Sequence, residues 1–292
     1  MNDNDPKNHE QQPVRPPIRT IHIPDENFTA VFIDQGLNQL RGSRYCDLLE
    51  AKESWFVSLG MYGLYGVSVL GLLAAVVLPL RYDWLPGGYT LLGGLAWFLA
   101  TIVLHYIAWK FLPCIHHIIR ATPTRVSSPI LDVFALVTAL GGIGCLVWGI
   151  VLWVKTSSFS TFLFAVCLAV LSEYAALLSL RPSHLNIHTD GSRSAGQEFL
   201  GFLSYSVKLN LRLIPVTFGL GLFLGLAFMI NLLFSRYDYV GALLTDFGLT
   251  LAAVLYASLL PLSGYLIFLF WHFLIDLGSA ILGPQKQAED TP

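Results

Sequence analysis

The chain has 292 residues, of which 54% are hydrophobic and 12% are charged, and its mean hydropathy is +0.61. Soluble domains contain about 25% charged residues, so this composition excludes an ordinary soluble domain. It predicts a protein that crosses a lipid bilayer several times. The formal net charge is −2, and we expect no nucleic-acid partner.

The first 54 residues are predicted to form a polar N-terminal tail. Residues 1–19 contain four prolines and almost no apolar side chains, so they cannot bury enough surface to offset the entropy of ordering and should be disordered. Residues 28–34 are predicted to be extended because they are rich in β-branched and aromatic side chains. Residues 37–54 alternate leucines with charged residues, which indicates an amphipathic helix that leads to the membrane.

A transmembrane domain is predicted over residues 55–282, followed by a C-terminal tail at 283–292. It contains about six apolar segments, each near or above the length of about 20 residues that a helix needs to span a bilayer. The fold class is therefore an all-α membrane bundle. The six segments are Trp55 to Leu80, Tyr89 to Leu112, Pro129 to Val154, Phe159 to Leu180, Leu213 to Phe234 and Ala242 to Ile275.

The sixth segment is too long for a straight crossing, and Pro261 should kink it near its middle. Glycines in the first and fifth segments should let helices approach closely. Packing inside one bundle is the simpler interpretation of these glycines, and the seam of a homo-oligomer is the alternative. They are Gly60, Gly63, Gly66, Gly71, Gly221 and Gly225.

The longest polar interruption of the transmembrane domain is the loop 181–212, between the fourth and fifth segments. Here Ser194 is followed by Gln197 and Glu198, which predicts a helix beginning at Ala195. Its apolar face contains Leu200, Leu203, Val207 and Leu211, and its polar face contains Gly201, Ser204, Lys208 and Arg212. This pattern favours an amphipathic helix in the cytoplasmic membrane surface. The entry of the fifth spanning helix is an equally good interpretation.

Lysine and arginine residues predict the orientation. All but Arg81, Lys155 and Arg236 of the 17 lie in the N-terminal tail, the second and fourth loops, and the C-terminal tail. Because basic residues accumulate in cytoplasmic loops, both termini should be cytoplasmic, in a multi-pass protein of the cell membrane. The other three loops are short and contain tyrosine and tryptophan, which are favoured at the membrane–water interface on the outer side of the bilayer.

One tripeptide recurs in this topology. Arg81-Tyr82-Asp83 follows the first segment, and Arg236-Tyr237-Asp238 follows the fifth. The recurrence is compatible with a parallel duplication. Chance is the simpler explanation, because these residue types are common at membrane interfaces.

Glu173 is the sharpest chemical signal. It lies in the fourth segment, about 12 Å along the helix from the cytoplasmic end, where an ionised carboxylate costs about 2.5 kcal/mol or more. His105, in the second segment, should lie at a similar depth and pair with it. This intramembrane pair is interpreted as a hydrogen bond that fixes helix packing. A proton or ion site is the alternative.

The other histidines suggest metal chemistry. His105 and His272 both lie in the cytoplasmic thirds of their segments, so a b-type haem between them is a third interpretation. His116 and His117 stand just beyond the second segment, beside Cys114, where a metal is conceivable but contacts with headgroups are the commoner role. The four cysteines, at 46, 114, 145 and 167, form no CxxC pair. We therefore expect free thiols, no metal and no cofactor.

The function predicted from these residues is that of a non-catalytic structural or accessory membrane component. The motifs of zinc proteases, serine hydrolases and nucleotide hydrolases do not occur in the sequence. The first alternative is a small proton-coupled transporter or channel that uses Glu173, and the second is a haem protein that uses His105 and His272. The expected partners are the lipid bilayer and other membrane proteins or further copies of the chain.

Overall fold

The computed structural model describes residues 28–42, 52–82, 85–156, 159–189, 195–237 and 240–282. It divides into two units, residues 1–36 and 37–292, and the described part of the first unit is residues 28–36. The predicted disorder at 1–19, the predicted helix cap at Ser194, and the C-terminal tail at 283–292 lie outside the described residues.

Helix α1 (Phe28–Gly42) corrects one sequence prediction. Residues 28–34 are helical rather than extended. Leu37 and Arg41, one helical turn apart, both pack within the second unit: Leu37 is buried with Ala135 and Leu180, and Arg41 donates to the Leu180 carbonyl oxygen. Once those residues are fixed in a helix, each further residue adds a hydrogen bond at little cost, so helix propagation overrides the local β preference. Of the amphipathic helix predicted at 37–54, residues 43–51 are not described.

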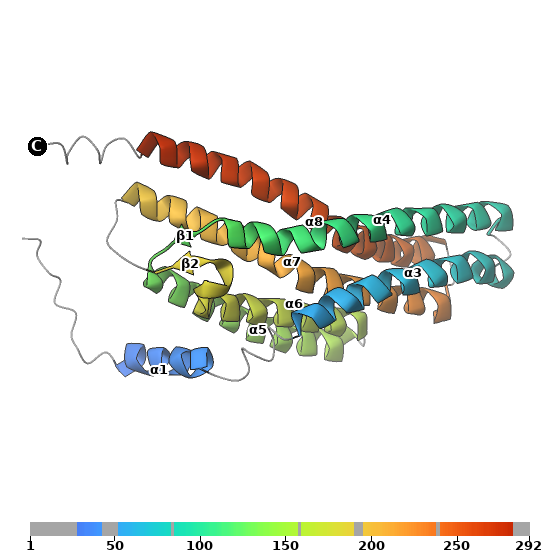
Figure 1. Ribbon diagram of the computed structural model, residues 1–292. Helices are drawn as coiled ribbons and strands as arrows, with labels where there is room; N and C mark the ends of the chain where they lie inside the picture. The colour runs from blue at the N-terminus through green and yellow to red at the C-terminus, as the bar shows by residue number, and fades with distance from the viewer. Residues whose placement is uncertain are drawn as a thin grey trace, which may run out of the picture. The chain divides into compact units, whose positions relative to one another are not determined.

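The second unit contains the six predicted spans (Figure 1). Each is long and apolar enough to cross a membrane, which confirms an all-α bundle with six spans. Three extend well beyond the apolar segments read from the sequence, because their polar end turns continue the helix. The spans are α3 (Glu53–Arg81), α4 (Gly87–Ala121), α5 (Ser128–Thr156), α6 (Phe159–Leu180), α7 (Ala195–Phe234) and α8 (Val240–Leu282).

Helix α7 is the centre of the bundle. It packs on α3, α4 and α8 on one side and on α6 on the other, and α5 joins through its hairpin with α6. Two apolar clusters result. One contains Leu64, Phe218 and Val254 and joins α3, α4, α7 and α8. The other joins α5, α6 and α7 around Tyr174 and Val216.

The predicted glycines account for the close approach of these helices. An added Cβ at each position would meet a side chain of the neighbouring helix. This confirms packing inside one bundle as their role. The pairs are Gly60 with Phe218, Gly63 with Leu222, Gly66 with Leu226, Gly71 with Trp97, Gly221 with Ala257 and Gly225 with Val254.

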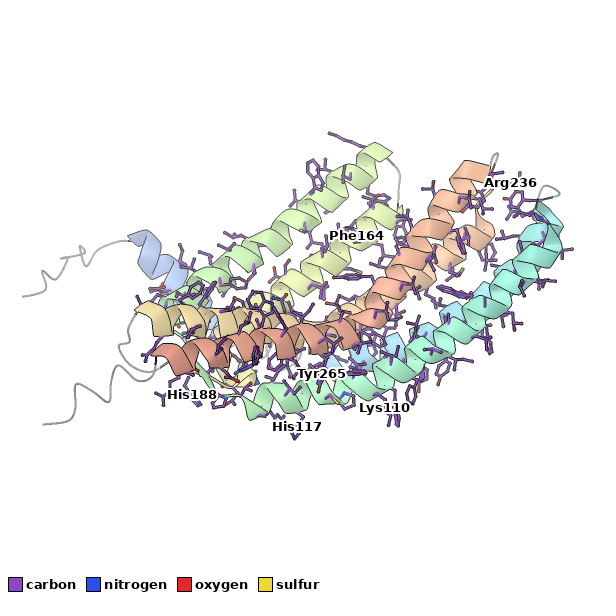
Figure 2. All side chains as sticks on the ribbon, turned by 90° about the horizontal axis from the view of Figure 1, so that it is seen from above. Lys110, His117, Phe164, His188, Arg236 and Tyr265 are labelled. Atoms are coloured by element: carbon purple, nitrogen blue, oxygen red, sulfur yellow. The ribbon has the colours of Figure 1, made fainter. Side chains whose placement is uncertain are left out.

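The structure decides between the two interpretations of the loop 181–212. Its C-terminal half does begin a helix at Ala195, as predicted, but this helix continues without interruption to Phe234. It is therefore the entry of the fifth span, and a separate surface helix is not confirmed. The residues expected on a solvated polar face are buried instead. Pro261 stands inside α8, and Figure 2 shows that helix changing direction partway along its length, as the predicted kink requires.

Two loops meet in a small parallel sheet that the sequence did not predict. Strand β1 (Thr124–Arg125) follows α4, and strand β2 (Ile187–His188) follows a 3-10 turn, η1 (Pro182–Leu185). Thr124 pairs with Ile187, and Arg125 pairs with His188. Asn186, between η1 and β2, has a φ of 53°, a conformation that asparagine tolerates better than most residues. We call the end of the bundle that carries β1 and β2 the strand end, and the opposite end the far end.

Candidate functional site

Three ionisable side chains from three helices meet at the strand end. Glu53 is the first residue of α3, His116 lies in the last turns of α4, and Arg212 lies in α7. Arg212 Nη2 is 2.7 Å from Glu53 Oε2, and His116 Nε2 is 3.0 Å from Glu53 Oε1. Arg212 Nη1 also contacts His116 Nδ1. We call these three residues the Glu53 triad.

The contacts of the triad require one tautomer of His116. Arg212 has donors but no acceptor, so His116 Nδ1 must accept the hydrogen bond from Nη1. The imidazole proton then stands on Nε2, which lies 3.0 Å from Glu53 Oε1, although Oε1 accepts no hydrogen bond among the described residues. Glu53 and Arg212 are 6% and 8% exposed. A buried ion pair needs such additional hydrogen bonds to offset the loss of hydration.

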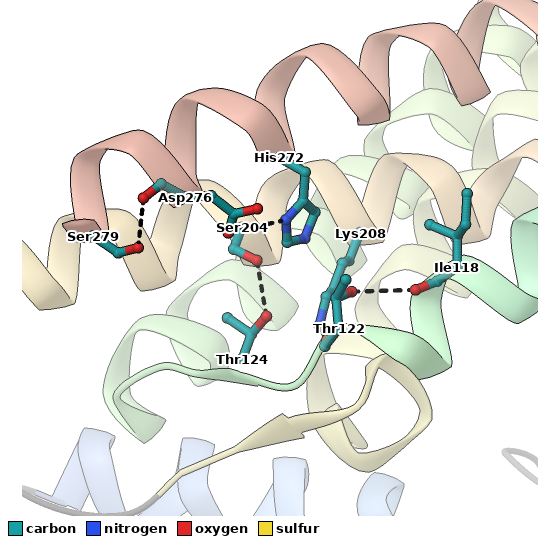
Figure 3. Close-up of polar contacts among 8 residues, drawn as sticks. All are labelled: Ile118, Thr122, Thr124, Ser204, Lys208, His272, Asp276 and Ser279. Atoms are coloured by element: carbon teal, nitrogen blue, oxygen red, sulfur yellow. Dashed lines mark hydrogen bonds and ion pairs between the residues drawn. The ribbon is translucent and has the colours of Figure 1, made fainter.

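Lys208, one turn before Arg212, is completely buried. Its ammonium group donates to the carbonyl oxygens of Thr122, Leu185 and Asn186, the last two at 3.2 and 3.4 Å. Three donors thus meet three carbonyls. Thr122 ends α4, where the unpaired carbonyls carry partial negative charge, so a cation is favoured there. Lys208 therefore ties α7 to the ends of α4 and η1, and Figure 3 shows it beside Thr122.

Further polar contacts join the same segments. Figure 3 shows Ser204 on α7 against Thr124 on β1, with the two hydroxyl oxygens 2.8 Å apart. Glu198, in the first turn of α7, accepts a hydrogen bond of 2.9 Å from the Ser127 backbone amide. Gly201 lies against the Arg125 carbonyl oxygen, so a side chain at this position would collide with β1. The face of α7 predicted to be solvated thus binds the two loops.

A cavity of about 570 Å³ borders the Glu53 triad between α3 and α4. Its polar wall is formed by the triad with Ser54 and Ser58. The rest of its lining is largely apolar, and consists of Val57, Met61, Trp109, Leu112, Pro113 and Pro215. A second cavity of about 490 Å³ shares Pro113 and His116 with the first and is also lined by His117, Arg120 and Ala121.

The predicted Glu173 and His105 have different neighbours in the structure. His105 Nε2 is 3.0 Å from the Tyr65 hydroxyl on α3, and the two rings lie 4.5 Å apart. Glu173 instead faces α5, where its Oε1 is 2.8 Å from the position that a Cβ would occupy at Gly142. The position of a residue in the sequence gives its place along a helix axis but not the direction in which its side chain points.

The other predicted histidines also have neighbours within the chain. The His272 ring lies 4.7 Å from Phe268, and its Nδ1 is 3.9 Å from Asp276 Oδ1, both on its own helix α8. In the described part of the chain, no hydrogen bond or ring contact joins His272 to His105, whose ring lies against Tyr65. His116 belongs to the Glu53 triad, whereas His117 is exposed. Among the described residues, no group of three histidine, cysteine, aspartate or glutamate side chains is arranged to hold a metal.

A second polar cluster, which the sequence did not predict, lies at the far end. Tyr237 donates to Asp246 Oδ2 at 2.8 Å, and its backbone amide donates to the Tyr82 hydroxyl at 3.0 Å. The two tyrosines of the recurring tripeptide are therefore neighbours. Burial, reinforced by the hydrogen bond and charge of Asp246, raises the pKa of Tyr237. The available signal was Asp246, a carboxylate inside the sixth apolar segment.

The chain matches no family model, no curated protein and no solved structure. The six long apolar helices nevertheless define its class, which is that of multi-pass membrane proteins in a lipid bilayer.

Proposed function

We propose that this protein is a non-catalytic accessory component of the cell membrane, whose strand end faces the cytoplasm and presents a rigid surface to a partner membrane protein. The observation that carries the proposal is the use of the buried charges. Arg212 on α7 pairs with Glu53 on α3, and Lys208 on α7 donates to the carbonyl oxygen of Leu185 in η1. These contacts hold the helices and loops in a fixed arrangement. Exposed residues of the two strand loops, such as Arg125 and His188, then stand on a rigid base.

The orientation is supported by the distribution of basic residues. The strand end carries Arg120, Arg125 and the loop 181–212, whereas the far end carries Arg81, Lys155 and Arg236. Since basic residues accumulate on the cytoplasmic side, the strand end is assigned to the cytoplasm.

Site-specific photo-crosslinking in the native membrane tests the accessory role. A photoreactive amino acid at His188, exposed on β2, should yield a defined adduct of higher mass, and the same residue at Lys155, exposed at the far end, should not. Mass spectrometry of the adduct identifies the partner. Equal labelling at both positions, or lipid adducts alone at His188, would contradict the proposal.

Proton-coupled transport through Glu173 is the second candidate, and one observation favours it. The carboxylate lies within the fourth span against Gly142, a place where an ionisable group is costly and often functional. Reconstituted liposomes with an internal pH-sensitive dye test this candidate. Proton flux above that of empty liposomes, if Glu173→Gln abolishes it in a folded protein, would identify the protein as a transporter and contradict the accessory role.

A further inference from the structure

We infer that the cavity beside the Glu53 triad is a binding site for one anionic phospholipid of the leaflet at the strand end. Its phosphate group would lie at the polar wall, and the start of an acyl chain would lie along the apolar wall. The inference does not depend on whether the strand end holds a partner protein.

The polar wall offers donors suited to a phosphate. Arg212 is 8% exposed, and its Nε is buried without a hydrogen-bond partner among the described residues. Ser54 and Ser58 are exposed on α3; Ser54 adds a hydroxyl donor, whereas the Ser58 hydroxyl donates to the Ser54 carbonyl oxygen at 2.9 Å. The Glu53 charge is already offset by Arg212 at 2.7 Å, so the carboxylate does not leave the wall negative.

Cations beside the cavity give it a preference for a net negative headgroup. Lys110 Nζ lies 4.8 Å from the ring of Trp109, which lines the cavity. Arg120 and His117 line the adjoining cavity, which shares His116. Arginine and lysine at a membrane surface attract anionic headgroups. A tryptophan beside such a lysine is also typical of the interface, where headgroups lie.

The apolar wall decides between a lipid and a free anion. Val57, Met61 and Leu112, about one or two helical turns from the triad along α3 and α4, form the apolar side of the cavity. A hydrated inorganic phosphate gains nothing from such a surface, whereas an acyl chain gains burial. The volume of about 570 Å³ lies within the range of about 300 to 1,000 Å³ that is usual for ligand sites. A phospholipid headgroup with its first methylenes therefore fits both walls.

Thermal unfolding of the detergent-solubilised, full-length protein tests the inference. Phosphatidylglycerol should raise the melting temperature by roughly 3 °C at a concentration about tenfold above its dissociation constant. Phosphatidylcholine should raise it by less than half as much. Inorganic phosphate at the same concentration should have no effect, and an equal shift with inorganic phosphate would identify a free-anion site and overturn the lipid assignment.

Two variants locate the site. Ser58→Phe fills the cavity from an exposed position and should abolish the shift in melting temperature. Native mass spectra of this variant should also show no bound phosphatidylglycerol. Val69→Phe is the matched control, because it is exposed on the same face of α3 three turns away, and it should keep the full shift. Lys110→Gln combined with Arg120→Gln, both exposed, should remove the preference for the anionic lipid. An unchanged shift in Ser58→Phe, or an unchanged preference in the double variant, would overturn the inference.

Discussion

Arg212 Nη2 lies 2.7 Å from Glu53 Oε2, and this contact joins the central helix α7 to the first residue of α3. His116 contacts both side chains, so α4 is held in the same place. Because the contact is buried, its loss should destabilise the whole bundle. Its contribution to the free energy of unfolding can be compared with that of an exposed ion pair.

Replacing one member of this pair should strongly destabilise the protein. Arg212→Met leaves the Glu53 carboxylate buried and without its cation, which costs about 3 to 5 kcal/mol. The double variant with Glu53→Met removes both charges and should recover most of this loss. Arg41→Met is the control, since its pair with Asp132 is 42% and 31% exposed and should contribute less than about 1 kcal/mol. Unfolding in detergent measures all three, and equal costs for Arg212→Met and Arg41→Met would contradict the buried role.

Lys208 should be equally important for attaching the two strand loops. Lys208→Met keeps the length of the side chain but leaves three carbonyl oxygens without their donor, at a cost of about 1 to 3 kcal/mol or more. Limited proteolysis should then cleave more quickly between β1 and α5, near Ser127. Lys110→Met, on the exposed face of α4, is the matched control and should leave the cleavage rate unchanged. Wild-type protection in Lys208→Met would show that the sheet holds the loops without it.

Cysteine labelling checks the orientation. In a variant whose four native cysteines are replaced by serine, His188→Cys should react with an impermeant maleimide only after the membrane is opened. Lys155→Cys should react in intact cells, because the far end is assigned to the outside. The reverse pattern would place the strand end outside.

Glu173→Gln separates a structural role from a proton-carrying one. The amide retains the size and hydrogen-bonding capacity of the carboxylate but cannot titrate, so a structural role predicts a melting temperature within about 2 °C of the wild type and no loss of host phenotype. Gly142→Ala would place a Cβ 2.8 Å from Glu173 Oε1, so the flexible Glu173 side chain should have to move. A folded but inactive Gln variant would favour transport.

Tyr237 should make stability depend on pH at the alkaline end. Its pKa is raised in the folded state by burial and by Asp246, so the folded protein retains the phenolic proton after the unfolded chain has lost it. The stabilisation is therefore complete below about pH 10 and declines as pH rises toward the folded pKa. Compared with wild type, Tyr237→Phe should lose stability less steeply above that pH, by up to about 1.4 kcal/mol per pH unit. Identical slopes between pH 9 and 11 would contradict this.

The sequence by itself determined the six spans and several of their ends. Apolar segments of sufficient length must satisfy their backbone within a helix once they enter lipid, so length and hydropathy suffice to find them. The start of α7 at Ala195 and the packing role of Gly60 and Gly63 followed from equally local rules. Local rules failed at residues 28–34, where a helix anchored by Leu37 and Arg41 replaced the expected extended segment.

The tertiary structure decided which polar residues meet. The sequence predicted Glu53 at the end of the polar N-terminal tail and Arg212 on the polar face of a surface helix. In the structure they form the best-buried ion pair described at the strand end. Glu173 and His105 were predicted to pair, but Glu173 faces α5 and His105 contacts α3. The sequence specifies position along each helix axis, because the rise per residue is constant. Which side chains face one another depends on how the helices pack around α7, and that packing is a property of the whole bundle.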